Sequence, residues 1–140
     1  ASDVYKRQML FSDDKQIDKA VLGSAGWYTF LNNEPFPYGM RNMPIERDRY
    51  EWFLSRQVLF ILGAKDNDPN HESLNNSRGA RKQGANRFDR GTSYFKNIVS
   101  FSEKNKIPFR WRYKVISNLD HNTTIMSQNA IPFLLEGLDY

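Results

Sequence analysis

The feature that most restricts the possible folds of this chain is the segment QVLFILGA, residues 57–64. It is an uninterrupted apolar run of strand length that ends at Gly63. A strand whose residues are nearly all apolar is buried on both faces, and such strands are typical of parallel sheets covered by helices on both sides. The segment therefore predicts the central strand of an α/β sheet.

Two further segments have the composition of strands. DKAVLGSA, residues 18–25, contains a short apolar run, and PFRWRYKVI, residues 108–116, alternates apolar residues with Arg110, Arg112 and Lys114. A period of two with basic side chains on one face predicts a strand at or near an edge of the sheet, where charge discourages pairing with another chain.

Helical segments separate these strands. We expect the end of a helix at residues 9–16, a short helix within 45–56, the longest helix at about 80–105, and a closing helix from Thr123 that is disturbed by Pro132. Apolar residues recur every three to four positions in the longest helix, which predicts one buried face. Strands that alternate with helices predict three parallel strands with flanking helices, as in the C-terminal part of a doubly wound α/β sheet.

Composition narrows the class of protein further. The 140 residues are enough for one domain, the net charge of +4 is modest, and the absence of cysteine excludes disulfides and zinc–cysteine sites. No segment has the apolar length of a membrane-spanning helix, so we expect no membrane span.

Residues 1–8 resemble the translation of a sequencing-library adapter. We therefore expect the domain to cover residues 9–140, with sequence missing before it. Any export signal would be missing too, so secreted and periplasmic locations both stay open.

The carboxyl ends of parallel strands form the edge at which α/β proteins bind ligands. The expected loops at that edge are residues 26–45, 65–80 and 117–122. The second loop carries Asp66 just after the central strand, and the third carries His121 after the last strand. A carboxylate and an imidazole at neighbouring strand ends suit acyl transfer, because the histidine carries the proton and the carboxylate orients the ring.

Four stretches of the chain are similar to the C-terminal half of bacterial α/β-hydrolases related to polyhydroxyalkanoate depolymerases and feruloyl-type esterases. They are VLGSAGWYTF…PFPYGM, LFILGAKDNDPNHESL, QGANRFDRGTSYF and FRWRYKVISNLDHNTTIM. The resemblance implies a serine hydrolase that cleaves small-molecule or polymeric carboxylic esters through an acyl-enzyme, without a cofactor. It implies Asp66 as the triad acid and His121 as the base, in the chain order of that fold. The chain departs from the family's GVGH at NLDH, where Asp120 precedes the histidine.

Two other side chains compete for roles in such a site. Asp68 lies two residues after Asp66, and the shape of the loop decides which carboxylate meets the imidazole. Ser24 lies in LGSAG, where leucine replaces the first glycine of the G-x-S-x-G elbow and a proline-bearing loop follows in place of a helix. We therefore expect Ser24 to be a strand-end residue and the nucleophile to lie upstream of Met9.

A non-catalytic domain, either a degenerate hydrolase or a basic ligand-binding module, is the alternative function. The basic residues Arg78, Arg81, Lys82, Arg87 and Arg90 cluster within a short segment. No stacking motif for nucleic acid accompanies them, so we expect a solvated helix start, structural ion pairs and no nucleic-acid partner. Arg87 and Arg90, three residues apart, are expected to brace the polar loop.

Metal sites have weaker support in the sequence. DNDPNHE begins with acidic and amide residues at alternate positions, as an EF-hand does, but His71 and Ser77 stand where the glycine and the glutamate belong. A zinc site that combines His71, His121 and an aspartate lacks the usual ligand spacing. We expect no bound metal. The aromatic loop at 26–45 is equally suited to an acyl or aryl pocket and to packing over the edge of the sheet.

Overall fold

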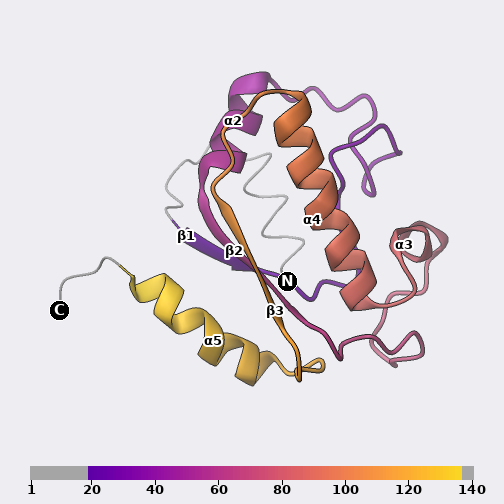
Figure 1. The fold of residues 1–140 in the computed structure, drawn as a ribbon. Coiled ribbons are helices and arrows are strands. Elements are labelled where there is room, and N and C mark those ends of the chain that lie inside the picture. Colours follow the sequence, from indigo (N-terminus) through magenta and orange to yellow (C-terminus); the bar gives the residue numbers. More distant parts are fainter. Residues whose placement is uncertain (1–18, 137–140) are drawn as a thin grey trace.

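The sheet described within residues 19–136 consists of three parallel strands in the order β1, β2, β3. The computed structural model, which describes those residues, places β1 at Lys19–Leu22, β2 at Gln57–Gly63 and β3 at Trp111–Ile116 (Figure 1). β2 is the middle strand, and all of its residues after the first are buried. Its all-apolar composition is thus explained, and the predicted α/β fold is confirmed. The helix expected at 9–16 lies outside the described residues.

Helices cover both faces of this sheet. The helices of the described part of the chain are α2 (Arg47–Ser55), α3 (Arg78–Gln83), α4 (Arg87–Lys104) and α5 (Thr123–Leu135). α4 lies over one face and α5 over the other (Figure 1). Side chains of β2 alternate accordingly, with Phe60 in the larger hydrophobic cluster on the α4 side and Ile61 in the smaller cluster on the α5 side. None of these helices is long and apolar enough to cross a membrane.

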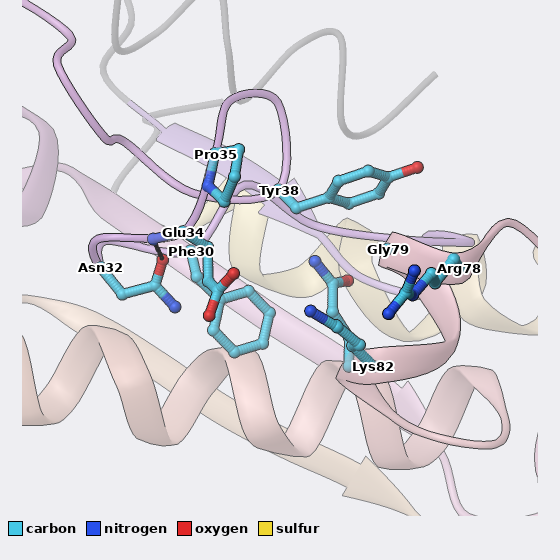
Figure 2. A pocket seen from close by; sticks show the side chains of 9 residues that line it. Phe30, Asn32, Glu34, Pro35, Tyr38, Arg78, Gly79 and Lys82 are labelled. Atoms are coloured by element: carbon cyan, nitrogen blue, oxygen red, sulfur yellow. Dashed lines mark hydrogen bonds between the residues drawn. The ribbon is translucent and has the colours of Figure 1, made fainter.

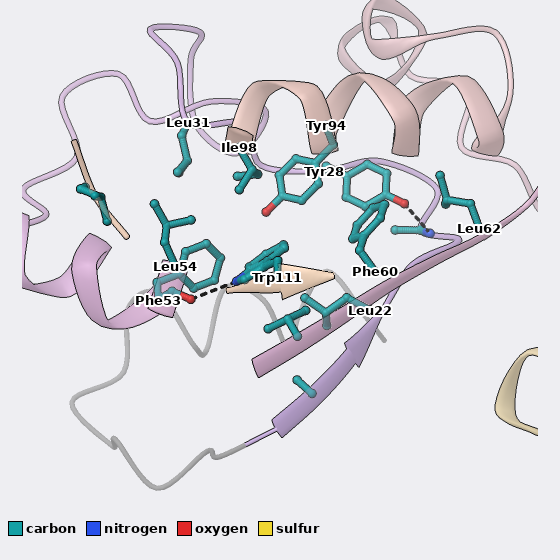
Figure 3. Close-up of a cluster of buried hydrophobic side chains, with 14 of the residues drawn as sticks. Leu22, Tyr28, Leu31, Phe53, Leu54, Phe60, Leu62, Tyr94, Ile98 and Trp111 are labelled. Atoms are coloured by element: carbon teal, nitrogen blue, oxygen red, sulfur yellow. Dashed lines mark hydrogen bonds between the residues drawn. The ribbon is translucent and has the colours of Figure 1, made fainter. Parts of the chain in front are cut away.

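Stacked aromatic rings fill the larger cluster (Figure 3). Tyr28 and Tyr94 stack with ring centroids 4.6 Å apart, and Phe60 and Trp111 stack at 6.5 Å. The indole N–H of Trp111 donates to the carbonyl oxygen of Phe53 at 3.2 Å, which satisfies its polar atom inside the core. Burial raises the pKa of both tyrosines well above the usual range. Tyr28 belongs to the aromatic loop, so this part of the loop packs the core.

The prediction of one helix over 80–105 is wrong, because α3 and α4 are separate helices. Gly84 ends α3 with φ 152°, a backbone conformation in which a helix cannot continue. Asn86 then begins α4 by accepting a hydrogen bond from the backbone N–H of Asp89 at 2.8 Å. Asparagine is a favoured N-cap because its side chain satisfies a backbone donor that the first turn leaves free.

The last strand and the last helix lie where the sequence predicts them, with small differences in their boundaries. β3 begins at Trp111, later than the segment 108–116, and forms an edge of the described sheet. Its side chains Tyr113 and Val115 remain 40% and 38% exposed because the edge receives less cover than the centre. α5 continues through Pro132 to its last turn, although proline removes one backbone donor from the helix.

Gly63 allows the loop after β2 to touch the loop after β3. A Cβ atom added to Gly63 would overlap the backbone carbonyl of Leu119. The same carbonyl accepts a hydrogen bond from the backbone N–H of Lys65 at 2.9 Å, and Ala64 donates to the carbonyl of Ile116 at 3.0 Å. The two loops are therefore joined backbone to backbone, which only glycine permits at this position.

We predict that Gly63→Ala lowers the free energy of unfolding by about 1–3 kcal/mol, because backbone must move to make room for one methyl group. Gly26→Ala is the matched control, since a Cβ there would lie 3.6 Å from its nearest neighbour, an ordinary contact. Urea denaturation of both variants measures the difference. Equal stability of the two variants would show that the close approach of the loops is not required.

Candidate active site

Asp66 lies on a tight turn at the carboxyl end of β2. Its backbone N–H donates to the carbonyl of Gly63 at 3.1 Å, and its own carbonyl accepts from the N–H of Phe88 in the first turn of α4 at 2.9 Å. The side chain is only 6% exposed. The backbone N–H and the backbone carbonyl of Asp66 are thus both bonded to regular structure. These two bonds fix the direction of its buried carboxylate.

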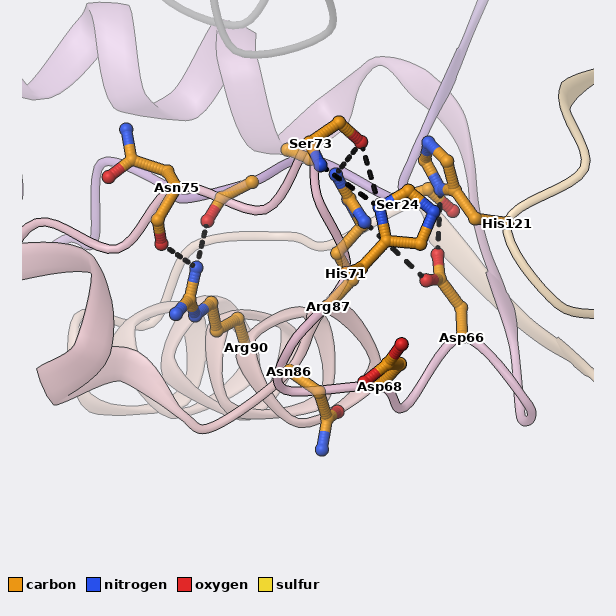
Figure 4. A network of polar contacts seen from close by, with 12 residues as sticks. Ser24, Asp66, Asp68, His71, Ser73, Asn75, Asn86, Arg87, Arg90 and His121 are labelled. Carbon is orange, nitrogen blue, oxygen red and sulfur yellow. Dashed lines mark hydrogen bonds and ion pairs between the residues drawn. The ribbon is translucent and has the colours of Figure 1, made fainter.

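His121 meets this carboxylate from the loop after β3. Its Nδ1 atom lies 2.9 Å from Oδ2 of Asp66, within hydrogen-bond distance (Figure 4). The imidazole is 26% exposed, so the ring is accessible while its partner is buried. Asp68, the alternative acid, is exposed, and its Oδ1 accepts from the backbone N–H of Asn70 at 2.8 Å. The structure therefore brings together Asp66 and His121, and leaves Asp68 as a loop residue.

Arg87 supports the carboxylate from the other side. It is 5% exposed, and its Nη1 lies 3.9 Å from Oδ1 of Asp66 in a buried ion pair. Its Nη2 donates to Oγ of Ser73 at 2.8 Å. The expectation that Arg87 braces the polar loop agrees with these contacts. A buried carboxylate requires such a partner, because an isolated buried charge is costly.

A second histidine packs beside the first. The ring of His71 meets that of His121 edge to face with centroids 5.6 Å apart. Its Nδ1 accepts a hydrogen bond from the backbone N–H of Ser73 at 3.2 Å. Sequence reasoning considered His71 only as a metal ligand and missed this contact with His121.

Arg90 joins three segments of the site. It is 1% exposed and donates from Nε to the carbonyl of Gly84 at 2.8 Å, and from Nη1 to the carbonyls of Gly26 at 2.6 Å and Asn75 at 2.8 Å. No described carboxylate pairs with it. Burial, and then the charge of Arg87, lower the pKa of Arg90 from its ordinary value. Within residues 19–136 carbonyl dipoles balance the guanidinium, and it holds the loop after β1, the loop after β2 and the α3–α4 turn together.

Ser24 lies beside the site without joining it. Its backbone has φ 55°, in the left-handed region, and its hydroxyl donates to the sulfur of Met126 at 3.1 Å. No hydrogen bond links it to His121. The chain beyond Ser24 continues as a loop, as predicted, and no helix follows until α2.

A groove of about 590 Å³ opens in front of these side chains. Ser24, Ser73, Arg87 and His121 form its polar side. Its other walls are mainly apolar side chains of β1, β2 and α5: Val21, Leu22, Ile61, Met126, Ala130, Ile131 and Leu134. An exposed imidazole next to an apolar groove can take a proton from a bound group while the groove holds the rest of the molecule.

Residues that could hold a metal do not gather in the described part of the chain. Among residues 19–136 no group of three histidine, aspartate, glutamate or cysteine side chains has a suitable arrangement.

Two solved structures have closely similar backbones. A poly(aspartic acid) hydrolase from Sphingomonas sp. KT-1 matches with a TM-score of 0.83 and 28% identity, over 94% of this chain and 50% of that chain. A poly(3-hydroxybutyrate) depolymerase from Bordetella parapertussis matches with a TM-score of 0.82 and 21% identity, over 96% of this chain and 47% of that chain. The chain has a partial α/β-hydrolase fold.

This chain thus spans about half the length of the two hydrolases. No protein-family model and no curated protein matches it. The likeness lies in the fold, and it agrees with the part of an α/β sheet that the sequence predicts.

We predict that Arg90→Met lowers the free energy of unfolding by about 3 kcal/mol, because three buried carbonyls lose a charged donor. Arg110→Met, at an exposed arginine, is the control and should change stability by less than about 0.5 kcal/mol. Thermal and urea unfolding measure both. A loss in Arg90→Met no larger than in the control would show that the guanidinium does not hold the loops.

We also predict a downfield ring N–H proton signal for His121 in the ¹H NMR spectrum, because Asp66 accepts its Nδ1 proton. Asp66→Ala should abolish the signal, and Asp68→Ala should retain it. Loss of the signal in Asp68→Ala alone would move the acid by two residues.

Proposed function

We propose that Asp66 and His121 are the acid and base of a serine-type hydrolase that cleaves carboxylic esters through an acyl-enzyme. The observation that carries this proposal is the 2.9 Å contact between a buried carboxylate and an accessible imidazole at the carboxyl edge of a parallel sheet. Two proteins with similar backbones are hydrolases, which supports the same class of reaction.

Each group has a defined task in that reaction. Asp66 accepts the Nδ1 proton of His121, which leaves Nε2 free to take the proton of a serine hydroxyl as it attacks the ester carbonyl. His121 then returns the proton to the leaving alcohol, and Asp66 stabilises the imidazolium that exists between the two steps. Arg87 offsets the negative charge of the carboxylate and helps keep it in place.

The nucleophile in this proposal comes from residues that precede β1. Ser24 is a poor candidate because its hydroxyl donates to a sulfur atom and no helix follows its strand. In the elbow of α/β-hydrolases, by contrast, the serine sits on a sharp turn from strand into helix, and the next backbone N–H contributes to the oxyanion hole. The half-length coverage of the two similar hydrolases is in line with a second half that supplies these groups.

The substrate in this proposal is a polymer or oligomer with acyl linkages. Both similar hydrolases are named for polymeric substrates, a poly(aspartic acid) and a poly(3-hydroxybutyrate). The groove beside His121 is open at the surface and mainly apolar, which suits the acyl part of a chain that extends beyond it.

A labelling experiment on the reading frame extended upstream tests the nucleophile. A fluorophosphonate probe reacts with an activated serine, and mass spectrometry of the labelled peptide locates it. We expect the label on a serine before β1, and no label in His121→Ala. A label on Ser24, or a protein that resists the probe, would favour a rearranged site or the non-catalytic domain.

Steady-state hydrolysis of short-chain aryl esters by the same extended protein tests the acid and base. We predict that His121→Ala and Asp66→Ala lower kcat by about 10³- to 10⁴-fold, as removal of triad members does elsewhere. Asp68→Ala should retain kcat within about twofold. A similar loss in Asp68→Ala would contradict the assignment of Asp66 as the acid.

A further inference from the structure

A second hollow lies at the other end of the same two loops. It has a volume of about 590 Å³ and is bordered by Phe30, Glu34 and Tyr38 from the loop after β1, and by Arg78 and Lys82 of α3 (Figure 2). His121 does not border it, so it is distinct from the groove of the candidate active site.

The walls of this pocket are built into the fold. A Cβ on Gly79 would overlap the ring of Tyr38, so glycine in α3 lets the ring lie directly on the helix backbone. The hydroxyl of Tyr38 shares a hydrogen bond of 2.7 Å with Oγ of Ser77, the N-cap residue of α3. Trp27 packs edge-on against the same ring at 5.2 Å. The position of the tyrosine is thus fixed from three sides.

Among the described residues, the rim of the pocket carries two positive charges and one negative charge. Arg78 and Lys82 lie four residues apart, on the same face of α3, and both are exposed. Neither forms an ion pair with any described residue, and α3 contains no acidic residue. Glu34 supplies the one carboxylate at the rim. Two free cations therefore face a hollow that one carboxylate does not neutralise.

The pocket and the groove of the candidate active site are bordered by the same two loops. The loop after β1 contributes Gly26 to the groove and Phe30 to the pocket, while the loop after β2 leads from Ser73 at the groove to Arg78 at the pocket. Arg90 joins these two loops, because its guanidinium donates to the carbonyls of Gly26 and Asn75. An extended ligand that lies along the two loops would therefore border both sites.

We infer that the pocket binds a carboxylate side group of a polymer chain whose acyl linkage lies at His121. This inference rests on the proposed function and adds that its polymeric substrate carries negatively charged side groups. The guanidinium of Arg78 has two parallel N–H donors that match the two oxygens of a carboxylate, and the ammonium of Lys82 adds another donor. Phe30 and Tyr38 then pack against the polymer chain that carries the carboxylate. The same two exposed cations also attract nucleic acid, so an oligonucleotide serves as the competing probe.

Binding of short peptides to the 140-residue chain tests this inference without any turnover. The probes are an oligo-aspartate and an oligo-asparagine of the same length, titrated by calorimetry and by NMR. We expect binding of the anionic peptide only, weaker at higher salt because exposed charges are screened. Arg78→Gln and Lys82→Gln should each weaken binding by about three- to fivefold, and together by about tenfold.

Arg81→Gln is the matched control, because this arginine is exposed on the same helix but does not border the pocket. It should weaken binding by less than about twofold. Equal effects of all three variants, equal binding of the neutral peptide, or no binding by the unmodified chain would each overturn the inference. Tighter binding of an oligonucleotide with the same sensitivity to Arg78 and Lys82 would assign the pocket to nucleic acid instead.

The result is independent of the nucleophile. If oligo-aspartate binds and the binding depends on Arg78 and Lys82, the pocket binds carboxylates even where fluorophosphonate labelling fails. If labelling succeeds and oligo-aspartate does not bind, the proposed hydrolase acts on uncharged substrates. Thermal unfolding of each variant confirms that the fold is retained, as expected for exposed side chains.

Discussion

The functional edge of this protein depends on one buried cation, Arg90. Three backbone carbonyls from three different segments point at its guanidinium, and no described carboxylate neutralises it. Loops normally leave their carbonyls to water, so an edge assembled from long loops needs an internal donor of this kind. The planar group has five N–H donors in fixed directions, which lysine cannot reproduce. Both the groove at His121 and the basic pocket lie along loops that Arg90 ties together.

The sequence predicts the sheet and the proximity of Asp66 and His121. The all-apolar QVLFILGA run predicts a central parallel strand, and this topology alone places Asp66 and His121 at neighbouring strand ends. The choice of Asp66 over Asp68 comes from the family resemblance, because the local sequence does not fix which carboxylate meets the imidazole. The pairing depends on a turn in which Asp66 points inward and Asp68 accepts from Asn70, and side-chain type does not encode that direction.

Other features escaped sequence reasoning for different physical reasons. The apolar period begins at Phe88, and the prediction of one helix over 80–105 does not use Gly84 and Asn86 as signals of a break between α3 and α4. The basic cluster reads as one patch, yet Arg87 and Arg90 are buried while Arg78, Arg81 and Lys82 are exposed. The burial of Arg90 depends on carbonyls that come from distant parts of the chain. The sequence pattern around an arginine therefore does not predict whether it is buried.

The contacts that hold Asp66 and His121 together all lie after β1. The ring, the carboxylate, Arg87 and the backbone bonds between their loops come from β2, β3 and the segments that follow them. The loop after β1 contributes to the surrounding core instead, through Tyr28, Leu31 and the Gly26 carbonyl. Substitutions before β2 can therefore change the stability of the sheet while the contact between Asp66 and His121 keeps its own supports.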